Sequence, residues 1–202
     1  MQLDWSVHIV LETERMLLRR LTEADAGPLA ALYGDPLVMR FITLQPPSLA
    51  EVESKILPAY LSEYRELADG LGSFAAIEKV SGQLAGRFSL KPANSYGLDG
   101  GMELGYRLHP AFWGRGLATE GARALIGSAF ERLHLDRVVA TTMAGNTGSW
   151  RVLEKCGLRR ARTFHYPDAD LMLGAEHGDF IYELTRSDWS GQEEHLDSYP
   201  TT

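Results

Sequence analysis

The chain has 202 residues, of which 45% are hydrophobic and 23% charged, and this is the composition of an ordinary globular domain. Its net charge of −7 argues against nucleic acid as the main partner, and it has no run of about 18 apolar residues, so we expect no membrane span. A single cysteine excludes an internal disulfide, and the histidines show no ligand spacing, so we expect a cytoplasmic protein without a metal site.

The first third of the chain predicts one strand followed by two helices. The strand covers residues 15–21, and the helix after it begins at Thr22 as N-cap and ends near Gly34. Apolar residues between positions 49 and 67 recur every three or four residues, which is typical of an amphipathic helix. Pro58 lies inside this second helix and is expected to kink it.

The period of the pattern then changes to two, which predicts strands. Residues 72–90 predict two strands joined by a turn at Ser81–Gly82, and a glycine-rich loop follows them. The next strand, 102–108, is expected to carry Glu103 and Arg107 on one face and apolar or aromatic side chains on the other.

The second half of the chain alternates helices and strands. A helix with a wide apolar stripe is predicted over 117–133, a strand over 136–143, and a short helix from Asn146 to Gly157. Two last strands are expected in 158–164 and 178–186. The element order β-α-α-β-β-β-α-β-α-β-β indicates a mixed α/β sheet in one domain.

Two glycines and an arginine stand directly before the 117–133 helix, in the stretch HPAFWGRGLATEGARAL. The first N–H groups of a helix have no partner within it and the helix dipole is positive there, so bare glycines would let a phosphate approach. A glycine turn that only packs the helix on the sheet is the alternative. The dinucleotide fingerprint fits poorly, because Thr119 stands where its third glycine belongs and Pro110, Phe112 and Trp113 separate the turn from its strand.

The segments MELGYRLHPAFWGRGLATEGARALIGSAF and VVATTMAGNTGSWRVLEKCGL together closely resemble the GNAT superfamily of acetyl-CoA-dependent N-acetyltransferases, and most of all its RimJ/RimL-like branch. The resemblance extends over about residues 11–186. It implies one α/β (α+β) domain, with a mixed, mostly antiparallel central sheet that is splayed at the cofactor site and flanked by about four helices. The domain would span 11–189, between an N-terminal extension, 1–10, and a flexible polar tail, 190–202.

The resemblance also implies a site for coenzyme A. In this family the N–H groups of the glycine loop bind the pyrophosphate, and the pantetheine arm pairs with the unpaired edge of the preceding strand. Asn146 would contact the arm from the other side, besides capping its own helix. The implicated residues are Tyr106, Arg107, Leu108, Trp113, Gly114, Arg115, Gly116, Leu117, Ala118, Thr119, Asn146 and Ser149. Trp113 departs from the Gln or Arg that usually stands first in this loop.

Acetyl transfer to an amine requires a base for the amine, a donor for the oxyanion and an acid for the leaving thiolate. Glu103 is the predicted base; a solvated glutamate or a partner of Arg107 is the alternative interpretation. The N–H near Leu108 is the predicted oxyanion donor. Ser149 is the predicted acid, with Tyr166 as an alternative whose position the sequence does not give.

The function predicted from the sequence is an acetyl-CoA-dependent N-acetyltransferase in which a primary amine attacks directly in a ternary complex. Cys156 lies near a helix C-terminus and is expected to be a buried apolar side chain rather than a nucleophile. The amine, a protein N-terminus or a small molecule, stays open; segments 40–48 and 163–178 are expected to select it. The rival interpretations are a non-catalytic acyl-CoA-binding sensor and a nicotinamide-binding protein, and the resemblance is compatible with a homodimer.

Overall fold

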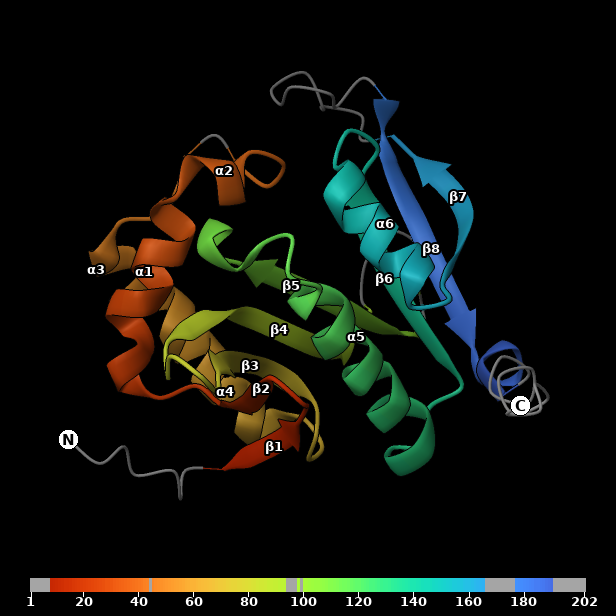
Figure 1. The fold of residues 1–202 in the computed structure, drawn as a ribbon, viewed down its shortest axis with the longest axis horizontal. Coiled ribbons are helices and arrows are strands. Elements are labelled where there is room, and N and C mark those ends of the chain that lie inside the picture. Colours follow the sequence, from red (N-terminus) through yellow and green to blue (C-terminus); the bar gives the residue numbers. More distant parts are fainter. Residues whose placement is uncertain (1–7, 44, 94–97, 99, 166–176, 191–202) are drawn as a thin grey trace.

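The computed structural model describes residues 8–43, 45–93, 98, 100–165 and 177–190. Within them, eight strands form one sheet in the order β1-β2-β3-β4-β5-β6-β8-β7 (Figure 1). Neighbouring strands are antiparallel except β5 and β6, which are parallel. The strands are β1 (Ile9–Glu12), β2 (Met16–Arg20), β3 (Gly72–Glu78), β4 (Leu84–Pro92), β5 (Met102–Leu108), β6 (Arg137–Met143), β7 (Arg159–Phe164) and β8 (Asp179–Thr185).

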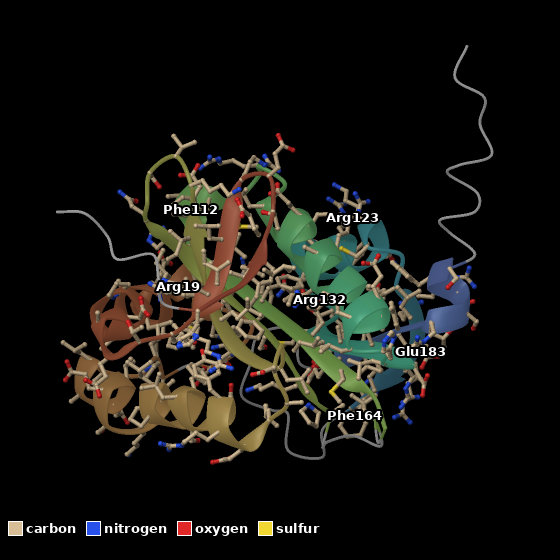
Figure 2. The ribbon with its side chains drawn as sticks, turned by 90° about the horizontal axis from the view of Figure 1, so that it is seen from below. Arg19, Phe112, Arg123, Arg132, Phe164 and Glu183 are labelled. Atoms are coloured by element: carbon tan, nitrogen blue, oxygen red, sulfur yellow. The ribbon has the colours of Figure 1, made fainter. Side chains whose placement is uncertain are left out.

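Helices cover both faces of this sheet (Figure 2). Successive residues of β3 alternate between two apolar cores, Phe74 and Ala76 in one and Ala75 and Ile77 in the other, as the pleat of a strand requires. The core of Ala75 and Ile77 is covered by α1 (Ala26–Gly34), α2 (Pro36–Met39), the segment Val52–Ile56 and α4 (Leu57–Glu66). The single turn α3 (Leu49–Glu51) precedes that segment and has no buried residue. The core of Phe74 and Ala76 is covered by α5 (Leu117–Gly127) and α6 (Thr147–Lys155).

The predicted mixed sheet is confirmed, and two short elements join it that the sequence pattern does not predict. One is β1, an edge strand of four residues that crosses the expected domain start at residue 11. The other is α2, a single turn whose only signal is Asp35 before Pro36; the Asp35 side chain accepts a hydrogen bond from the Leu37 N–H at 2.8 Å. Both elements are too short to show a periodic pattern.

The break expected at Pro58 takes the form of a π-helical segment, Val52–Ile56, between α3 and α4. The N–H of Leu57 donates to the carbonyl of Val52, five residues earlier, directly before the proline. Because Pro58 has no N–H, this is where the regular ladder is interrupted. Of the helices in the described part of the chain, none combines the length and the apolar character that crossing a lipid bilayer requires.

The helix α5 lies unusually close to the sheet. A Cβ on Gly121 would stand 2.5 Å from the ring of Phe88 in β4, so only glycine fits at this point of the helix. The predicted apolar stripe is confirmed, since Leu117, Leu125 and Ile126 are all almost completely buried. This packing fixes the start of α5 beside the end of β5.

Candidate active site

The sheet splits between its two parallel strands. Met102 and Glu103 of β5 pair with Val138 and Val139 of β6, and no further pair follows along β5. β6 instead stays paired with β8 over its whole length. The splayed sheet that the family resemblance implies is therefore present, and the second half of β5 has a free edge.

The free edge of β5 carries backbone groups that face the split. Arg107 pairs with Arg87 of β4, and the N–H of His109 donates to the carbonyl of Ala85 at 2.9 Å. Because antiparallel bonding alternates along a strand, the N–H and C=O groups of Tyr106 and Leu108 point away from β4. One of these carbonyls is already used: Trp113 Nε1 donates to the Leu108 oxygen at 2.6 Å and ties the following loop to the strand.

The glycine loop offers a row of free donors. Gly114 and Gly116 have φ of 71° and 79°, a left-handed conformation that favours glycine, and Gly116 is the N-cap of α5 without a side-chain cap. The first bond of the helix is donated by Glu120 to the carbonyl of Gly116. Among the described residues, none accepts a hydrogen bond from the N–H groups of residues 114–119. Six consecutive unpaired donors at a positive helix end fit a diphosphate.

Charged side chains clamp this loop from outside. Arg115 forms an ion pair of 2.6 Å with Glu78, the last residue of β3, and hydrogen bonds from Ser81 followed by Arg115 lower the pKa of Glu78 to about 2. Arg15 donates to the Arg115 carbonyl at 2.7 Å and pairs with Glu120 at 2.6 Å. The charge of Arg115 is thus engaged by a carboxylate, and its contribution to an anion site lies in its backbone N–H. The clamp formed by Arg15 cannot be read from sequence spacing.

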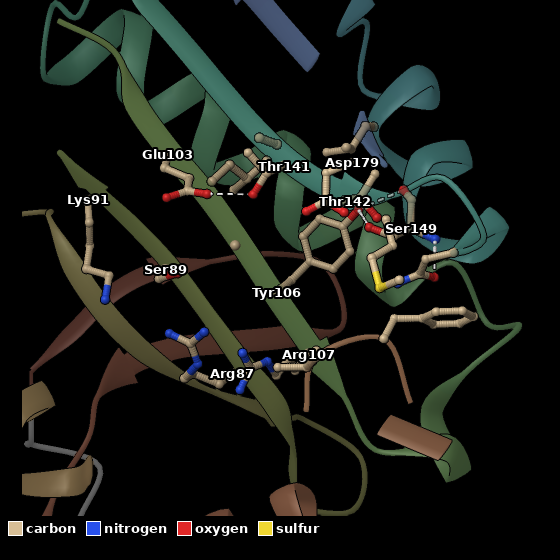
Figure 3. A pocket seen from close by; sticks show the side chains of 18 residues that line it. Arg87, Ser89, Lys91, Glu103, Tyr106, Arg107, Thr141, Thr142, Ser149 and Asp179 are labelled. Carbon is tan, nitrogen blue, oxygen red and sulfur yellow. Dashed lines mark hydrogen bonds between the residues drawn. The ribbon is translucent and has the colours of Figure 1, made fainter. Parts of the chain in front are cut away.

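Helix α6 supplies the other wall of the split. The Asn146 side chain accepts a hydrogen bond from the Ser149 N–H at 3.2 Å, so the expected N-cap is confirmed. The Tyr106 hydroxyl donates to the Ser149 carbonyl at 2.8 Å, and the two hydroxyl oxygens lie 3.1 Å apart (Figure 3). Burial raises the pKa of Tyr106, so its phenol is neutral. Tyr106 and Ser149 therefore form a hydroxyl pair that bridges β5 and α6.

A pocket of about 520 Å³ lies in the split and along the face of β4 and β5 opposite α5 (Figure 3). Glu103 lines it, and its Oε1 accepts a hydrogen bond of 2.9 Å from the Thr141 hydroxyl of β6. Among the described residues, none donates a hydrogen bond to its second oxygen. The alternative in which Glu103 pairs with Arg107 is not the arrangement of the structure, since Glu103 reaches across the split instead.

The remaining predicted residues are placed as follows. Phe41 and Ile42 of the expected specificity segment 40–48 line the pocket. Cys156 is 6% exposed, so its expected burial is confirmed, and burial raises the pKa of its thiol to about 11. Desolvation, rather than the helix end, is the main cause of this rise in pKa. Tyr166 and most of the 163–178 loop lie outside the described residues.

The sequence analysis missed the β4 side of the pocket. Arg87, Ser89 and Lys91 alternate along β4, and all three line the pocket. Their period-two spacing was a usable signal, but the face on which they lie follows only from the pairing with β5. No group of three metal-ligating side chains occurs in the part of the chain that the structure describes.

Comparison with known proteins gives concordant matches. A family model described as "Acetyltransferase (GNAT) domain" matches residues 15–159. FsC-acetyl coenzyme A-N(2)-transacetylase of Aspergillus fumigatus is 32% identical over 185 residues, covering 89% of this chain and 77% of its own. Bacillus subtilis YdaF, named a putative ribosomal N-acetyltransferase, is 30% identical over 186 residues, covering 89% of this chain and 96% of its own.

Solved structures share the fold at lower identity. Ribosomal-protein-S5-alanine acetyltransferase from Vibrio fischeri has a TM-score of 0.71 at 16% identity, covering 88% of this chain and 97% of its own. Aminoglycoside acetyltransferase AAC(6')-Ib in complex with coenzyme A has a TM-score of 0.68 at 20% identity, covering 88% of this chain and 99% of its own. At these identities the likeness establishes the fold alone.

Proposed function

The chain belongs to the GNAT acetyltransferase family and is an N-acetyltransferase of the RimJ/RimL-like branch, and on that premise we propose that it transfers an acetyl group from acetyl-CoA to a primary amine. The observation that carries the proposal is the row of free N–H groups at residues 114–119 beside the split of β5 and β6. These donors would hold the diphosphate of coenzyme A. The free edge at Tyr106 and Leu108 would pair with the amides of the pantetheine arm.

Glu103 is the proposed base. An ammonium has no lone pair, and amines have pKa values of about 8 at protein N-termini and about 10.4 in lysine, so the amine must lose a proton before it attacks. The Thr141 hydroxyl holds one oxygen of the Glu103 carboxylate, which leaves the other to accept this proton directly or through water. When acetyl-CoA is bound, it supplies a thioester whose C–S bond breaks as the new bond between nitrogen and the acetyl carbon forms.

The backbone and the hydroxyl pair serve the other two requirements. The Leu108 N–H faces the split and would donate to the oxyanion, as the Tyr106 N–H on the same edge also could. Ser149 would protonate the departing thiolate, and the hydroxyl of Tyr106 at 3.1 Å could return a proton to it. Cys156 takes no part, because a buried thiol with a raised pKa is a poor nucleophile. The amine therefore attacks directly in a ternary complex.

The acceptor is proposed only as a class. The name of the Aspergillus fumigatus relative points to an N(2) nitrogen, and the name of YdaF points to a ribosomal acceptor. Both relatives are about equally similar to this chain. We further propose that the protein is a homodimer, which light scattering on a sizing column would test.

A screen of primary amines with acetyl-CoA, followed by the release of free thiol, tests the proposal. The panel should contain peptides with free N-termini, polyamines, aminoglycosides and amino acids. We expect thiol release above the rate of hydrolysis with at least one amine. Tight binding of coenzyme A without release for any amine would favour the acyl-CoA-binding sensor, and calorimetric binding of NAD but not of coenzyme A would favour the nicotinamide-binding alternative.

A further inference from the structure

The floor of the pocket has two chemically opposite ends. Three residues of β4 pair with three residues of β5 across it: Arg87 with Arg107, Ser89 with Gly105, and Lys91 with Glu103. At the Glu103 end the cation is paired, because Lys91 forms an ion pair of 2.8 Å with Glu63 of α4. At the other end two arginines stand side by side (Figure 3).

The two arginines have no countercharge in the described part of the chain. Arg87 is only 7% exposed; its Nη1 donates to the Ser73 hydroxyl at 3.0 Å, and its buried Nε has no hydrogen-bond partner there. No described carboxylate lies within ion-pair distance of Arg87 or Arg107. Burial, followed by the nearby charge of Arg87, lowers the pKa of Arg107.

Aromatic rings support these cations but do not neutralise them. The guanidinium of Arg87 lies 5.1 Å from the ring centre of Tyr60, and that of Arg107 lies 5.2 Å from the ring centre of Tyr33. Burial raises the pKa of Tyr33, so its phenol stays protonated. Two like charges on directly opposed residues of a sheet are destabilising, and a buried unpaired charge is more so. Such an arrangement suits a site that a bound anion completes.

The middle of the floor is kept open by a glycine. A Cβ on Gly105 would stand 2.7 Å from the Ser89 hydroxyl oxygen, so any side chain there would crowd the space between the two ends. A molecule lying along the floor would meet the Glu103 carboxylate at one end and guanidinium donors at the other. Guanidinium groups match the two oxygens of a carboxylate or a phosphate.

We infer that the acceptor of this enzyme is an amine that also carries an anionic group, a carboxylate or a phosphate, which Arg87 and Arg107 bind while the amine lies toward Glu103. The inference rests on the proposed function, because it assigns the amine to Glu103. It adds a charge requirement that the family resemblance does not contain. Arg87 and Arg107 are then the residues that select the substrate.

Matched amines test this directly. The pairs are 4-aminobutyrate against 4-aminobutanamide, phosphoethanolamine against ethanolamine, and a short peptide beginning Ala-Glu against the same peptide beginning Ala-Gln. We expect the anionic member of at least one pair to have a kcat/KM about tenfold or more above its neutral partner, since hydrogen bonds to charged groups contribute strongly to recognition. Which pair responds tells a small carboxylate from a phosphate or a peptide side chain.

Variants then connect the preference to the pocket. In Arg87→Met the ratio of kcat/KM for the anionic amine to that for the neutral amine should fall to a value between about 1 and 3. Arg87→Lys should be intermediate, because lysine keeps the positive charge but lacks the paired N–H donors of a guanidinium group. Arg123→Met, which removes an exposed arginine of α5, is the control and should keep the wild-type ratio. Since Arg87→Met removes one of two adjacent like charges, it is expected to fold. Neutral members that react as fast as anionic ones, or a preference that survives Arg87→Met, would overturn the inference.

A binding measurement separates this inference from the proposed function. If no amine releases thiol, the enzymatic proposal fails, but the anion site is still measurable by thermal unfolding in the presence of coenzyme A. The anionic member of a pair should then raise the Tm of the wild type more than its neutral partner does, and this difference should vanish in Arg87→Met. An equal shift for both members in the wild type would overturn the anion site.

Discussion

Replacing Gly116 by alanine isolates the backbone conformation on which the proposed diphosphate site depends. Gly116 has φ of 79° and ψ of 1°, and a Cβ there would have Arg15 Nη2 as its nearest neighbour at 3.5 Å, an ordinary contact. Steric overlap is therefore not the problem; the left-handed conformation is. A residue with a Cβ is destabilised by about 1–2 kcal/mol in this left-handed conformation. The variant can relieve this strain by leaving the conformation, which turns the free N–H groups of residues 114–119 away from one another.

The size of the effect follows from that strain. If most of this strain energy is lost from the binding free energy of coenzyme A, its affinity should fall about five- to thirtyfold, since 1.4 kcal/mol is a factor of ten. Gly116→Val should lose more, because a β-branched residue tolerates positive φ least. Calorimetric titration with coenzyme A measures both, with thermal unfolding as the check that each variant is folded.

Gly127, at the other end of the same helix, provides the control. Its φ of −56° and ψ of −49° are helical, and a Cβ there would meet only Glu131 Oε1 at 4.0 Å. Gly127→Ala should therefore bind coenzyme A as the wild type does and be more stable by about 0.4–1 kcal/mol. A folded Gly116→Ala variant with wild-type affinity, or an equal loss in Gly127→Ala, would refute the role assigned to the loop.

Four further variants test the chemistry and the clamp. Glu103→Gln should lower kcat by about 10²–10⁴, as expected for a lost general base, while calorimetry finds the coenzyme A affinity retained; an unchanged kcat would remove Glu103 from the mechanism. Ser149→Ala should bind coenzyme A and lower kcat about tenfold or more in the thiol-release assay, and a normal rate would leave the acid unassigned. Cys156→Ala should keep full turnover, whereas a large loss would restore the covalent pathway. Glu78→Gln should destabilise the protein near neutral pH, because a folded pKa of about 2 means that the Glu78 carboxylate stabilises the fold above its unfolded pKa of about 4.5. As pH falls from about 4.5 toward 2 this contribution disappears, so the difference in Tm between the wild type and the variant should shrink. A difference in Tm that stays constant over this pH range would contradict the role assigned to Glu78.

Local sequence signals predicted the elements that form the proposed coenzyme A site. The glycines at 114 and 116 are the residues that left-handed backbone requires, and the apolar stripe of α5 follows from its own spacing. Asn146 predicts the start of α6, because its side chain can accept a hydrogen bond from the first turn of a helix. Each of these features depends on residues near one another in the chain. These features can therefore be predicted from the sequence.

The proposed acceptor end of the pocket depends on pairing between distant segments. The sequence places Arg87 and Arg107 on strands, but it does not say that they lie opposite each other. The segment between β4 and β5 is long enough to allow more than one register, and a shift by one residue would exchange the faces of every side chain. A shift by four would place Arg87 opposite Glu103 and make an ordinary ion pair. Only the observed register brings the two arginines together.

The two halves of the site also differ in the kind of group they use. The proposed coenzyme site consists of backbone N–H groups in the loop and along β5, which any sequence able to form the turn and the strand can supply. The proposed acceptor end consists of the side chains of Arg87, Arg107 and Glu103, which a few substitutions would alter without disturbing the sheet. Relatives can therefore share the coenzyme and the fold while acting on different amines. It follows that a relative's name is weak evidence for the acceptor of this enzyme, and that the charges on the pocket floor are the better guide.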